Sequence, residues 1–239
     1  MIVLLCAVGF LVVVVTFVVV SRQGGGQEEE TPSFLPEISS RPTPAKAQLE
    51  PRNLSAFLPQ HFVVLDLETT GLNPERSEII EFGAIRVTLN SQTHATFQTL
   101  VKPLRRIPAR ITEITGITQD MVDREGLQLE DALRQFVEFI GDLPLVTFNA
   151  EFDIGFLHAA ARQHGLAIPN RYTCALKRAR RAWPGLSSYR LADLAKLGNL
   201  SGEDTHRALG DCSRALIIFT SATSTLGQRV RWTTPRLSQ

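Results

Sequence analysis

The sequence predicts an α/β domain built on a mixed sheet, and three observations lead to this prediction. From residue 60 onward, three runs rich in apolar and β-branched residues follow one another with short polar connections, as in an antiparallel meander. Helical periodicity begins at Leu129 and then alternates with strand patterns, as in domains whose helices cover a sheet. Roughly 180 residues carry these patterns, enough for one domain with a full core.

The elements can be assigned in order along the chain. The expected strands are Phe62–Leu67, Ile79–Leu89, Thr93–Val101 and Pro144–Phe148. The expected helices are Leu129–Ile140, a helix from Asn149 to about Gln163, and residues 174–183, 189–197 and 205–226. Asn149 is expected to cap its helix, and Gly165 to close it, because these residue types favour the two helix ends.

Residues 2–20 predict a transmembrane anchor, which we assign to residues 1–21. The run has no charged residue, and as a helix it would span about 28 Å, close to the hydrocarbon thickness of a bilayer. A cleaved signal peptide is the alternative, but no positive n-region or small-residue cleavage site is evident. Arg22 follows the run and no Lys or Arg precedes it, which favours a cytoplasmic location for the rest of the chain.

The remaining chain divides into three parts by composition. Residues 22–59 contain six prolines, a Gly run and a Glu run, which predicts a disordered tether. The folded domain is expected over residues 60–227, and residues 228–239 form a C-terminal tail in which no polymerase- or clamp-binding element is recognised. The membrane is therefore one expected partner, through the N-terminal helix.

Charge and cysteine content restrict the function only weakly. The net charge of +1 does not indicate a nucleic-acid partner, so any such interaction must rest on local basic patches. The densest of these is Lys177–Arg181, which we interpret as a solvated helix face, with contact to a nucleic-acid backbone as the alternative. Cys6, Cys174 and Cys212 show no metal-binding or pairing pattern, which is compatible with a reducing compartment.

Asp66 and Glu68 are the first candidate site residues. They end an apolar strand pattern and, being two residues apart, point to the same face of that strand. Adjacent carboxylates repel each other and resist burial, so a divalent cation commonly neutralises them. The pair therefore suggests a metal-dependent hydrolase. A second such pair, Asp123 and Glu125, lies between polar residues and Gly126, which predicts a solvated turn without function.

Two further motifs make the first pair specific. Asn149-Ala-Glu-Phe-Asp153-Ile-Gly-Phe-Leu places Asp153 in the first turn of a helix, and His206-Arg-Ala-Leu-Gly-Asp211 begins the last helix. With VVLDLETTGL before them, these motifs resemble, in order, those of the DEDDh 3′ to 5′ exonucleases, the superfamily of the DNA polymerase III epsilon proofreading subunit. The resemblance covers residues 62 to about 220 and includes IIEFGAIRV and the ITGIT segment. It implies an RNase H-like fold with a mixed five-stranded sheet flanked by helices.

The resemblance also implies the roles of individual residues. It implies that Asp66, Glu68, Asp153 and Asp211 bind two Mg²⁺ ions, with Mn²⁺ as a substitute, and that His206 is the general base. An unperturbed histidine pKa near 6.5 suits proton uptake at neutral pH. The residues that the family uses to hold the terminal nucleotide correspond here to Thr69, Thr70, Gly71 and Leu72, and Asn149 is a candidate phosphate contact.

The sequence thus predicts a membrane-anchored exonuclease that releases nucleoside monophosphates from nucleic-acid 3′ ends. Single-stranded DNA is the favoured substrate, although the same kind of site serves RNA in this superfamily. An inactive, membrane-tethered nucleic-acid-binding module is the alternative from another class. Such a protein would be expected to lack a carboxylate or the histidine, and all five residues are present. Phe148 and Phe152 are expected in the core, and the other four histidines at structural or exposed positions.

Overall fold

The computed structural model describes residues 53–200 and 207–235. The expected membrane anchor at residues 2–20, most of the expected tether and His206 lie outside these ranges. Within the described ranges, no helix has the length and apolar character needed to cross a membrane.

The described residues form five strands and eight helices, one of them a 3₁₀ helix. The strands are β1 (His61–Thr69), β2 (Ile79–Thr88), β3 (Ala95–Leu100), β4 (Leu145–Thr147) and β5 (Tyr172–Cys174). The helices are η1 (Leu54–Ala56), α1 (Ala109–Thr115), α2 (Gln119–Glu125), α3 (Leu129–Ile140), α4 (Ala150–Gln163), α5 (Ala175–Ala182), α6 (Leu191–Leu197) and α7 (Ala208–Leu226).

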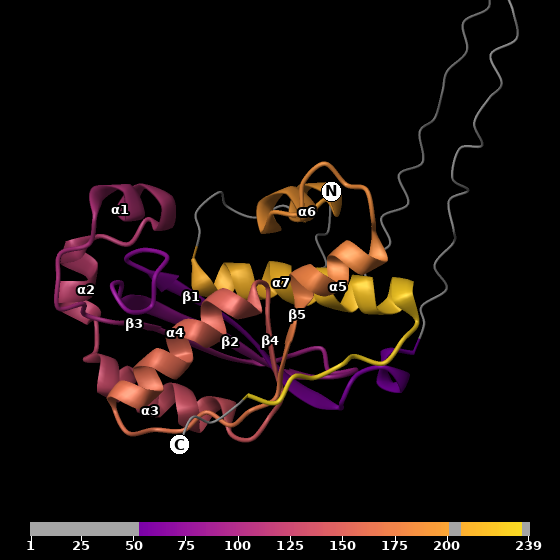
Figure 1. Ribbon diagram of the computed structural model, residues 1–239, viewed down its shortest axis with the longest axis horizontal. Helices are drawn as coiled ribbons and strands as arrows, with labels where there is room; N and C mark the ends of the chain where they lie inside the picture. Colours follow the sequence, from indigo (N-terminus) through magenta and orange to yellow (C-terminus); the bar gives the residue numbers. More distant parts are fainter. Residues whose placement is uncertain (1–52, 201–206, 236–239) are drawn as a thin grey trace, which may run out of the picture. The chain divides into compact units, whose positions relative to one another are not determined.

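The five strands form one mixed sheet in the order β3-β2-β1-β4-β5. The β1–β2 and β2–β3 pairs are antiparallel, because short connections join these consecutive strands. The β1–β4 and β4–β5 pairs are parallel, and helices lie in the intervening connections (Figure 1). The predicted mixed five-stranded sheet is therefore confirmed, with β1 at its centre.

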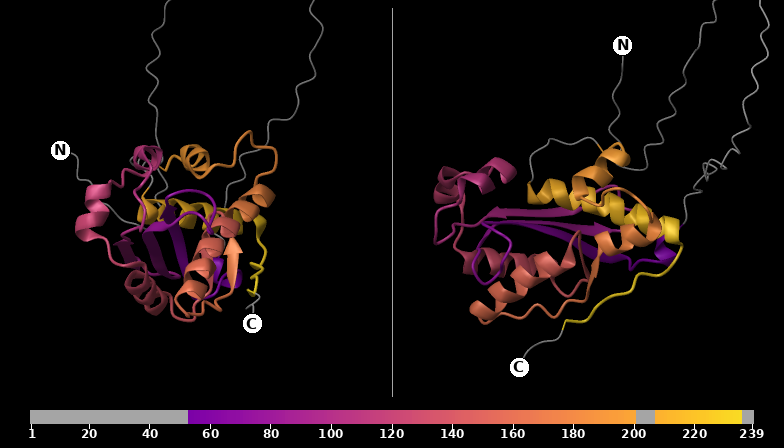
Figure 2. Two further views of the ribbon diagram at one scale, coloured as in Figure 1. Left: turned by 60° about the vertical axis from the view of Figure 1, so that its left-hand side comes forward. Right: turned by 45° about the horizontal axis from the view of Figure 1, so that its top comes forward.

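Helices cover both faces of this sheet, and alternation along β1 explains how (Figures 1 and 2). Phe62 and Val64 belong to the buried cluster formed with α7, where the rings of Phe62 and Phe219 meet edge to face at 6.0 Å. Val63 and Leu65 point the other way, into the cluster formed with α3 and α4. Successive strand residues alternate faces, so the even-numbered residues of β1 face α7.

The N-terminus of α7 lies directly against β2. A Cβ atom added at Gly83 would lie 2.5 Å from the carbonyl carbon of Ala208, closer than two carbon atoms can approach. Glycine at position 83 therefore permits the helix to begin on the sheet surface, beside the end of β1.

Most predicted elements are confirmed, but short ones were missed. Leu129–Ile140 is observed as predicted, whereas β5, α1 and α2 were not expected. Asp123 and Glu125 are exposed to solvent as predicted, but the predicted turn is wrong, because these residues end α2. The side chain of Thr118 caps that helix at Met121 N, and Val122 on its inner side is fully buried.

Both expected domain boundaries need correction. The chain is already folded at residues 53–59, which were assigned to the tether, since η1 forms there and Leu58 is buried in the α7-side cluster. The first part of the expected tail also packs on the domain. Val230 is buried and its amide donates to Phe57 O, while Thr233 forms a bridge with Tyr172 at the β5 edge.

Candidate active site

Asp66 and Glu68 lie near the end of β1, on the face that carries α7. They share the side of Phe62 and Val64, as the strand alternation requires, and both side chains are partly exposed. The register of the β1–β2 pair shifts between Glu68 and Thr69, so the regular hydrogen-bonded pairing of the two strands is interrupted directly after the second carboxylate. Such irregularities reorient side chains where a strand meets a functional site.

Asp211 completes a cluster of three carboxylates. It lies in the first turn of α7, which Gly83 allows to approach the sheet, and it is buried. One oxygen each from Asp66, Glu68 and Asp211 lies within 4.8 Å of the other two. The structure therefore brings together three of the four predicted metal ligands.

Asp153 approaches from the opposite side of the sheet. It lies in the first turn of α4 and is only 3% exposed. The hydroxyl of Thr147, the last residue of β4, donates to Asp153 Oδ2 at 2.5 Å. Burial raises the pKa of Asp153 to about 7, although hydrogen bonds from Thr147 and from the Leu67 backbone act to lower it. Asp153 lies outside the three-carboxylate cluster but interacts electrostatically with Asp66.

The carboxylates strongly perturb one another. Burial, followed by the charges of Asp153, Asp211, Glu68 and Glu81, raises the pKa of Asp66 well above its usual value. Burial and the charges of Asp211, Glu81 and Asp153 raise the pKa of Glu68 to about 8, against the opposing effect of Arg207. Without a cation, these groups therefore tend to hold protons near neutral pH.

The donor set fits a hard divalent cation. All the converging groups are carboxylate oxygens, which Mg²⁺, Mn²⁺ and Ca²⁺ prefer, and burial together with the neighbouring carboxylates raises the pKa of Glu68. Two like charges about 4 Å apart repel by roughly 4 kcal/mol at an effective dielectric constant near 20. A bound cation would replace this repulsion with attraction.

Glu81 is a buried carboxylate that sequence reasoning missed. It lies opposite Glu68 in the β1–β2 pair and is fully buried. It accepts hydrogen bonds from Arg207, from the Ala208 backbone N–H and from Gln98. A single charged residue within the apolar run Ile79–Ile85 was the available signal, since a buried charge requires a partner. Glu81 thus fixes the start of α7 above β2.

Arg214 is a second unforeseen neighbour of the site. Its Nε donates to Asp211 Oδ1 at 2.9 Å, and a terminal nitrogen contacts the same oxygen. The two residues are three apart on α7, so they lie on the same side of the helix. The positively charged guanidinium of Arg214 therefore lies against Oδ1 of Asp211, a predicted metal ligand.

The residues after Glu68 form a turn that is stabilised by the hydroxyl groups of Thr69 and Thr70. Thr69 is buried, and its hydroxyl donates to Gly71 O at 2.6 Å. The hydroxyl of Thr70 accepts from the Glu78 amide, and the Thr70 amide donates back to Glu78 O. A Cβ atom at Gly71 would lie 2.7 Å from Ser77 Oγ, so the turn is tight. The two hydroxyl groups therefore position the turn.

Leu72 and Asn149 are the accessible members of the predicted substrate-binding set. Leu72 is 85% exposed at the tip of the turn. Asn149 occupies the N-cap position of α4 and is exposed, but its side chain makes no capping hydrogen bond, contrary to the predicted cap. The Asn149 amide is therefore available next to Asp153, while Leu72 projects from the turn after Glu68.

The basic run on α5 is only partly a solvated face. Arg178 is buried, and it donates to Thr223 Oγ1 and Gln228 O, so it joins α5 to the end of α7. Lys177 is exposed and pairs with Glu151 at 2.7 Å. Phe148 and Phe152 are partly buried against the core clusters, as expected. The predicted base, His206, lies outside the described residues.

Comparison with known proteins gives concordant results. The RNase_T family model, described as exonuclease, matches residues 63–219. The DNA polymerase III subunit epsilon of Aquifex aeolicus (strain VF5) is 40% identical over 159 residues, which make up 66% of this chain and 78% of that protein. The residues matched by the family model contain all four carboxylates, from Asp66 to Asp211.

Solved structures share the fold. Exonuclease X in complex with 5′ overhanging duplex DNA superposes with a TM-score of 0.54 at 29% identity, covering 72% of this chain and 95% of that one. E. coli exonuclease I in complex with a dT13 oligonucleotide has a TM-score of 0.61 at 19% identity, covering 69% of this chain and 41% of that one.

Proposed function

This chain belongs to the RNase_T exonuclease family, and from this membership we propose that it hydrolyses single-stranded DNA stepwise from the 3′ end. It is a hydrolytic nuclease of the DEDDh type. The choice of DNA is supported by the name of its epsilon-subunit relative and by the oligonucleotide bound to exonuclease I. The observation that carries the proposal is the convergence of Asp66, Glu68 and Asp211 within 4.8 Å.

The four carboxylates would hold two divalent ions, Mg²⁺ or Mn²⁺. Such ions, when bound, supply activation of a water molecule and stabilisation of the leaving 3′ oxygen. Asp66, Glu68 and Asp211 offer oxygens to one shared point, and Asp153 approaches from α4. Thr147 holds the Asp153 carboxylate in place through one oxygen, as outer partners of metal ligands commonly do, and the charge of Asp153 acts on Asp66.

His206 is proposed as the general base that takes a proton from the attacking water. It precedes Arg207, whose guanidinium is anchored to Glu81, so the polypeptide is fixed one residue after the histidine. The proposed role requires the neutral imidazole, which predominates above a pKa near 6.5.

The turn after Glu68 is proposed to hold the terminal nucleotide. Thr69 and Thr70 shape the turn through their hydroxyl groups, and Gly71 keeps its backbone narrow. Leu72, which is largely exposed, would pack against the terminal base, because apolar side chains contact bases without sequence preference. Asn149 would donate its amide to a phosphate oxygen near Asp153.

We further propose that residues 2–20 anchor the chain in a membrane, with the nuclease domain in the cytoplasm. The support is the uncharged apolar run followed by Arg22. The test is fractionation of cells followed by protease treatment of spheroplasts. Full-length protein should stay in membranes after carbonate washing and should resist external protease. A soluble product shortened by about 20 residues would show a cleaved signal peptide instead.

The activity is tested with the full-length protein and 5′-labelled strands of DNA and RNA of one sequence. Each strand is incubated with Mg²⁺, Mn²⁺ or EDTA, and the two substrates are also mixed in competition. Faster stepwise shortening of DNA supports the proposal, whereas faster shortening of RNA would identify an exoribonuclease. Binding of both strands without hydrolysis in any metal would identify an inactive binding module.

A further inference from the structure

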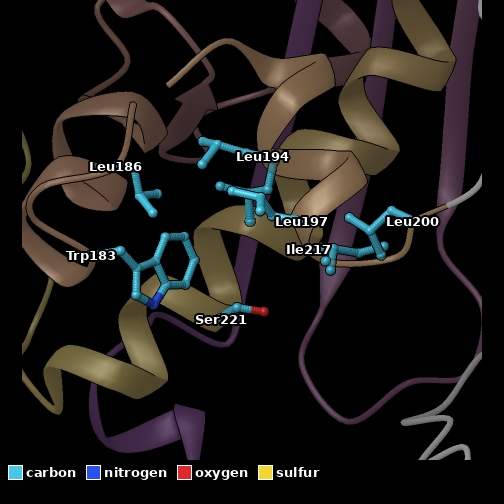
Figure 3. Close-up of a pocket in the computed structure, with 9 residues that line it drawn as sticks. Trp183, Leu186, Leu194, Leu197, Leu200, Ile217 and Ser221 are labelled. Carbon is cyan, nitrogen blue, oxygen red and sulfur yellow. The ribbon is translucent and has the colours of Figure 1, made fainter. Parts of the chain in front are cut away.

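A groove of about 380 Å³ lies between α5, α6 and α7. Its walls are almost entirely apolar and include Trp183 after α5, Leu194 and Leu197 on α6, and Ile217 and Ile218 on α7. Figure 3 shows the indole of Trp183 facing the leucine side chains across the hollow, with Ser221 below. The volume lies within the roughly 300–1,000 Å³ typical of small-molecule sites.

Part of this apolar wall is open to solvent. Leu197 is 68% exposed and Ile217 is 44% exposed, and both line the groove with the partly buried Trp183. Single exposed apolar residues are ordinary on protein surfaces, but residues from separate elements that gather around one hollow indicate a binding surface.

The segment that forms two walls of the groove is strongly basic. Residues 175–200 contain six Lys or Arg and one acidic residue, Asp193, which accepts a hydrogen bond from Ser188 at 2.6 Å. Five of the six cations are exposed, and Arg178 is the buried one; the exposed set is Lys177, Arg180, Arg181, Arg190 and Lys196. Arg180 lies over the ring of Tyr189 at 5.7 Å, next to the wall of the groove. An apolar hollow flanked by cations fits a ligand that has both flat apolar groups and negative charge.

The groove adjoins the carboxylate cluster along α7. Ile218 follows Asp211 by seven residues, which is about two helical turns, so the two residues share one side of the helix about 10 Å apart along its axis. Stacked nucleotides in one strand are about 3.4 Å apart, so this distance corresponds to about three nucleotides.

We propose that this groove is a nucleic-acid subsite that binds an unpaired base about three nucleotides before the 3′ end of the substrate strand. The base stacks on the indole of Trp183 among the leucine side chains, and the exposed cations face the neighbouring phosphates. This inference rests on the proposed function, because the 3′ end must lie at Asp66, Glu68 and Asp211. Aromatic stacking does not depend on base identity, so the subsite would bind without sequence preference.

The substrate strand explains the groove better than other occupants. A second copy of this chain would bring the same positive charge to the contact, which opposes association. An acidic peptide with bulky apolar side chains would satisfy the charge and the apolar wall. Only the strand, however, also accounts for the position of the groove along α7 from the carboxylates. Direct binding of such a peptide is therefore included in the test.

The kinetic test uses oligo-dT of two and ten nucleotides with the full-length protein. Leu197→Glu introduces a charge at an exposed position, and Trp183→Ala removes the stacking surface. Both variants should raise KM for the ten-nucleotide strand by about tenfold, as expected for loss of one stacked base. Hydrolysis of the two-nucleotide strand, which is too short to reach the groove, should stay within about twofold of wild type. Gln163→Glu, at the far end of α4, is the matched charge control and should change neither rate.

A binding measurement provides an independent readout. The chain has two tryptophans, so Trp232→Phe leaves Trp183 as the only source of indole fluorescence. In EDTA, ten-nucleotide oligo-dT should quench this fluorescence, and two-nucleotide oligo-dT should not. An acidic peptide that quenches it while the DNA does not would overturn the proposal.

The outcomes separate this inference from the proposed function. If the wild type hydrolyses neither length, the proposed function fails. If the wild type is active and the variants match it on ten nucleotides, the subsite is wrong. Equal losses on two and ten nucleotides would show that the groove only supports the fold, and would also overturn the proposal.

Discussion

Arg207 and Glu81 form an ion pair that joins the residue just before α7 to strand β2, the neighbour of the central strand β1. The Arg207 Nε lies 3.1 Å from both carboxylate oxygens of Glu81, and the next backbone N–H, of Ala208, also donates to Glu81. Glu81 is fully buried opposite Glu68, so its charge has no contact with water. The pair both neutralises this charge and fixes the helix that carries Asp211.

The first prediction concerns this ion pair. Arg207→Ala would leave the buried Glu81 carboxylate without its cation, which typically costs about 3–5 kcal/mol. The free energy of unfolding, measured by urea denaturation in EDTA, should fall by roughly this amount. Arg134→Ala is the matched control, because Arg134 pairs with Glu130 on the exposed side of α3. That variant should lose no more than about 0.5 kcal/mol, and equal losses in the two variants would disprove the role given to Arg207.

The second prediction concerns the carboxylates. Asp66→Asn or Asp153→Asn removes a ligand charge, so hydrolysis should be nearly abolished in Mg²⁺. Without metal, each variant should be as stable as the wild type or slightly more stable, because like-charge repulsion falls. Turnover and thermal unfolding in EDTA check the two effects. Asp120→Asn, on the exposed side of α2, should change neither. Near-normal turnover in either site variant would remove the carboxylates from the mechanism.

The third prediction is the pH dependence of stability without metal. The pKa values of Glu68 and Asp153 are raised to about 8 and about 7. Between about pH 4 and pH 8 the folded protein therefore binds more protons than the unfolded chain, so the free energy of unfolding should decrease as pH rises. Each of the two groups should contribute a loss of about 2 kcal/mol between pH 5 and pH 7 in EDTA.

Mg²⁺ should reverse this trend, because it binds the ionised carboxylates and stabilises most at the higher pH. Denaturation curves at pH 5, 6, 7 and 8, with and without Mg²⁺, measure both effects. Stability in EDTA that rises with pH over this range would contradict the electrostatic description of the site.

The fourth prediction concerns His206. Removal of a general base typically costs about 10² to 10⁴ in rate, so His206→Ala should lose turnover by this factor while binding of Mn²⁺ persists. In the wild type, the rate should rise as pH passes the histidine pKa. Loss of Mn²⁺ binding in the variant, measured by calorimetry, would make His206 a ligand or a structural residue rather than the base.

The central elements of the fold could be predicted because their sequences carry strong periodic patterns. The apolar alternation of β1 predicted that Asp66 and Glu68 share one face, and the structure places both on the α7 side. The amphipathic pattern of α3 gave both of its ends. The predicted positions of Asp153 and Asp211 near the starts of two helices are also confirmed, whereas their role as metal ligands came from the resemblance to the DEDDh exonucleases.

Short elements carry too little pattern to be predicted in this way. β5 has three half-buried residues, and α1 and α2 have seven residues each, so none completes a recognisable period. The network around Glu81 was missed for a different reason. Its partner Arg207 lies 126 positions away, and only the approach of α7 to β2 at Gly83 brings the two together.

The most direct test of the account is a time course on single-stranded DNA labelled at its 5′ end, with wild type and Asp211→Asn compared in Mg²⁺ and in EDTA. The account predicts a ladder that shortens one nucleotide at a time from the 3′ end, only for the wild type and only with Mg²⁺, and the release of nucleoside monophosphates. Internal cuts, removal of the labelled 5′ nucleotide, or equal shortening by Asp211→Asn would contradict a 3′ to 5′ exonuclease built on these carboxylates.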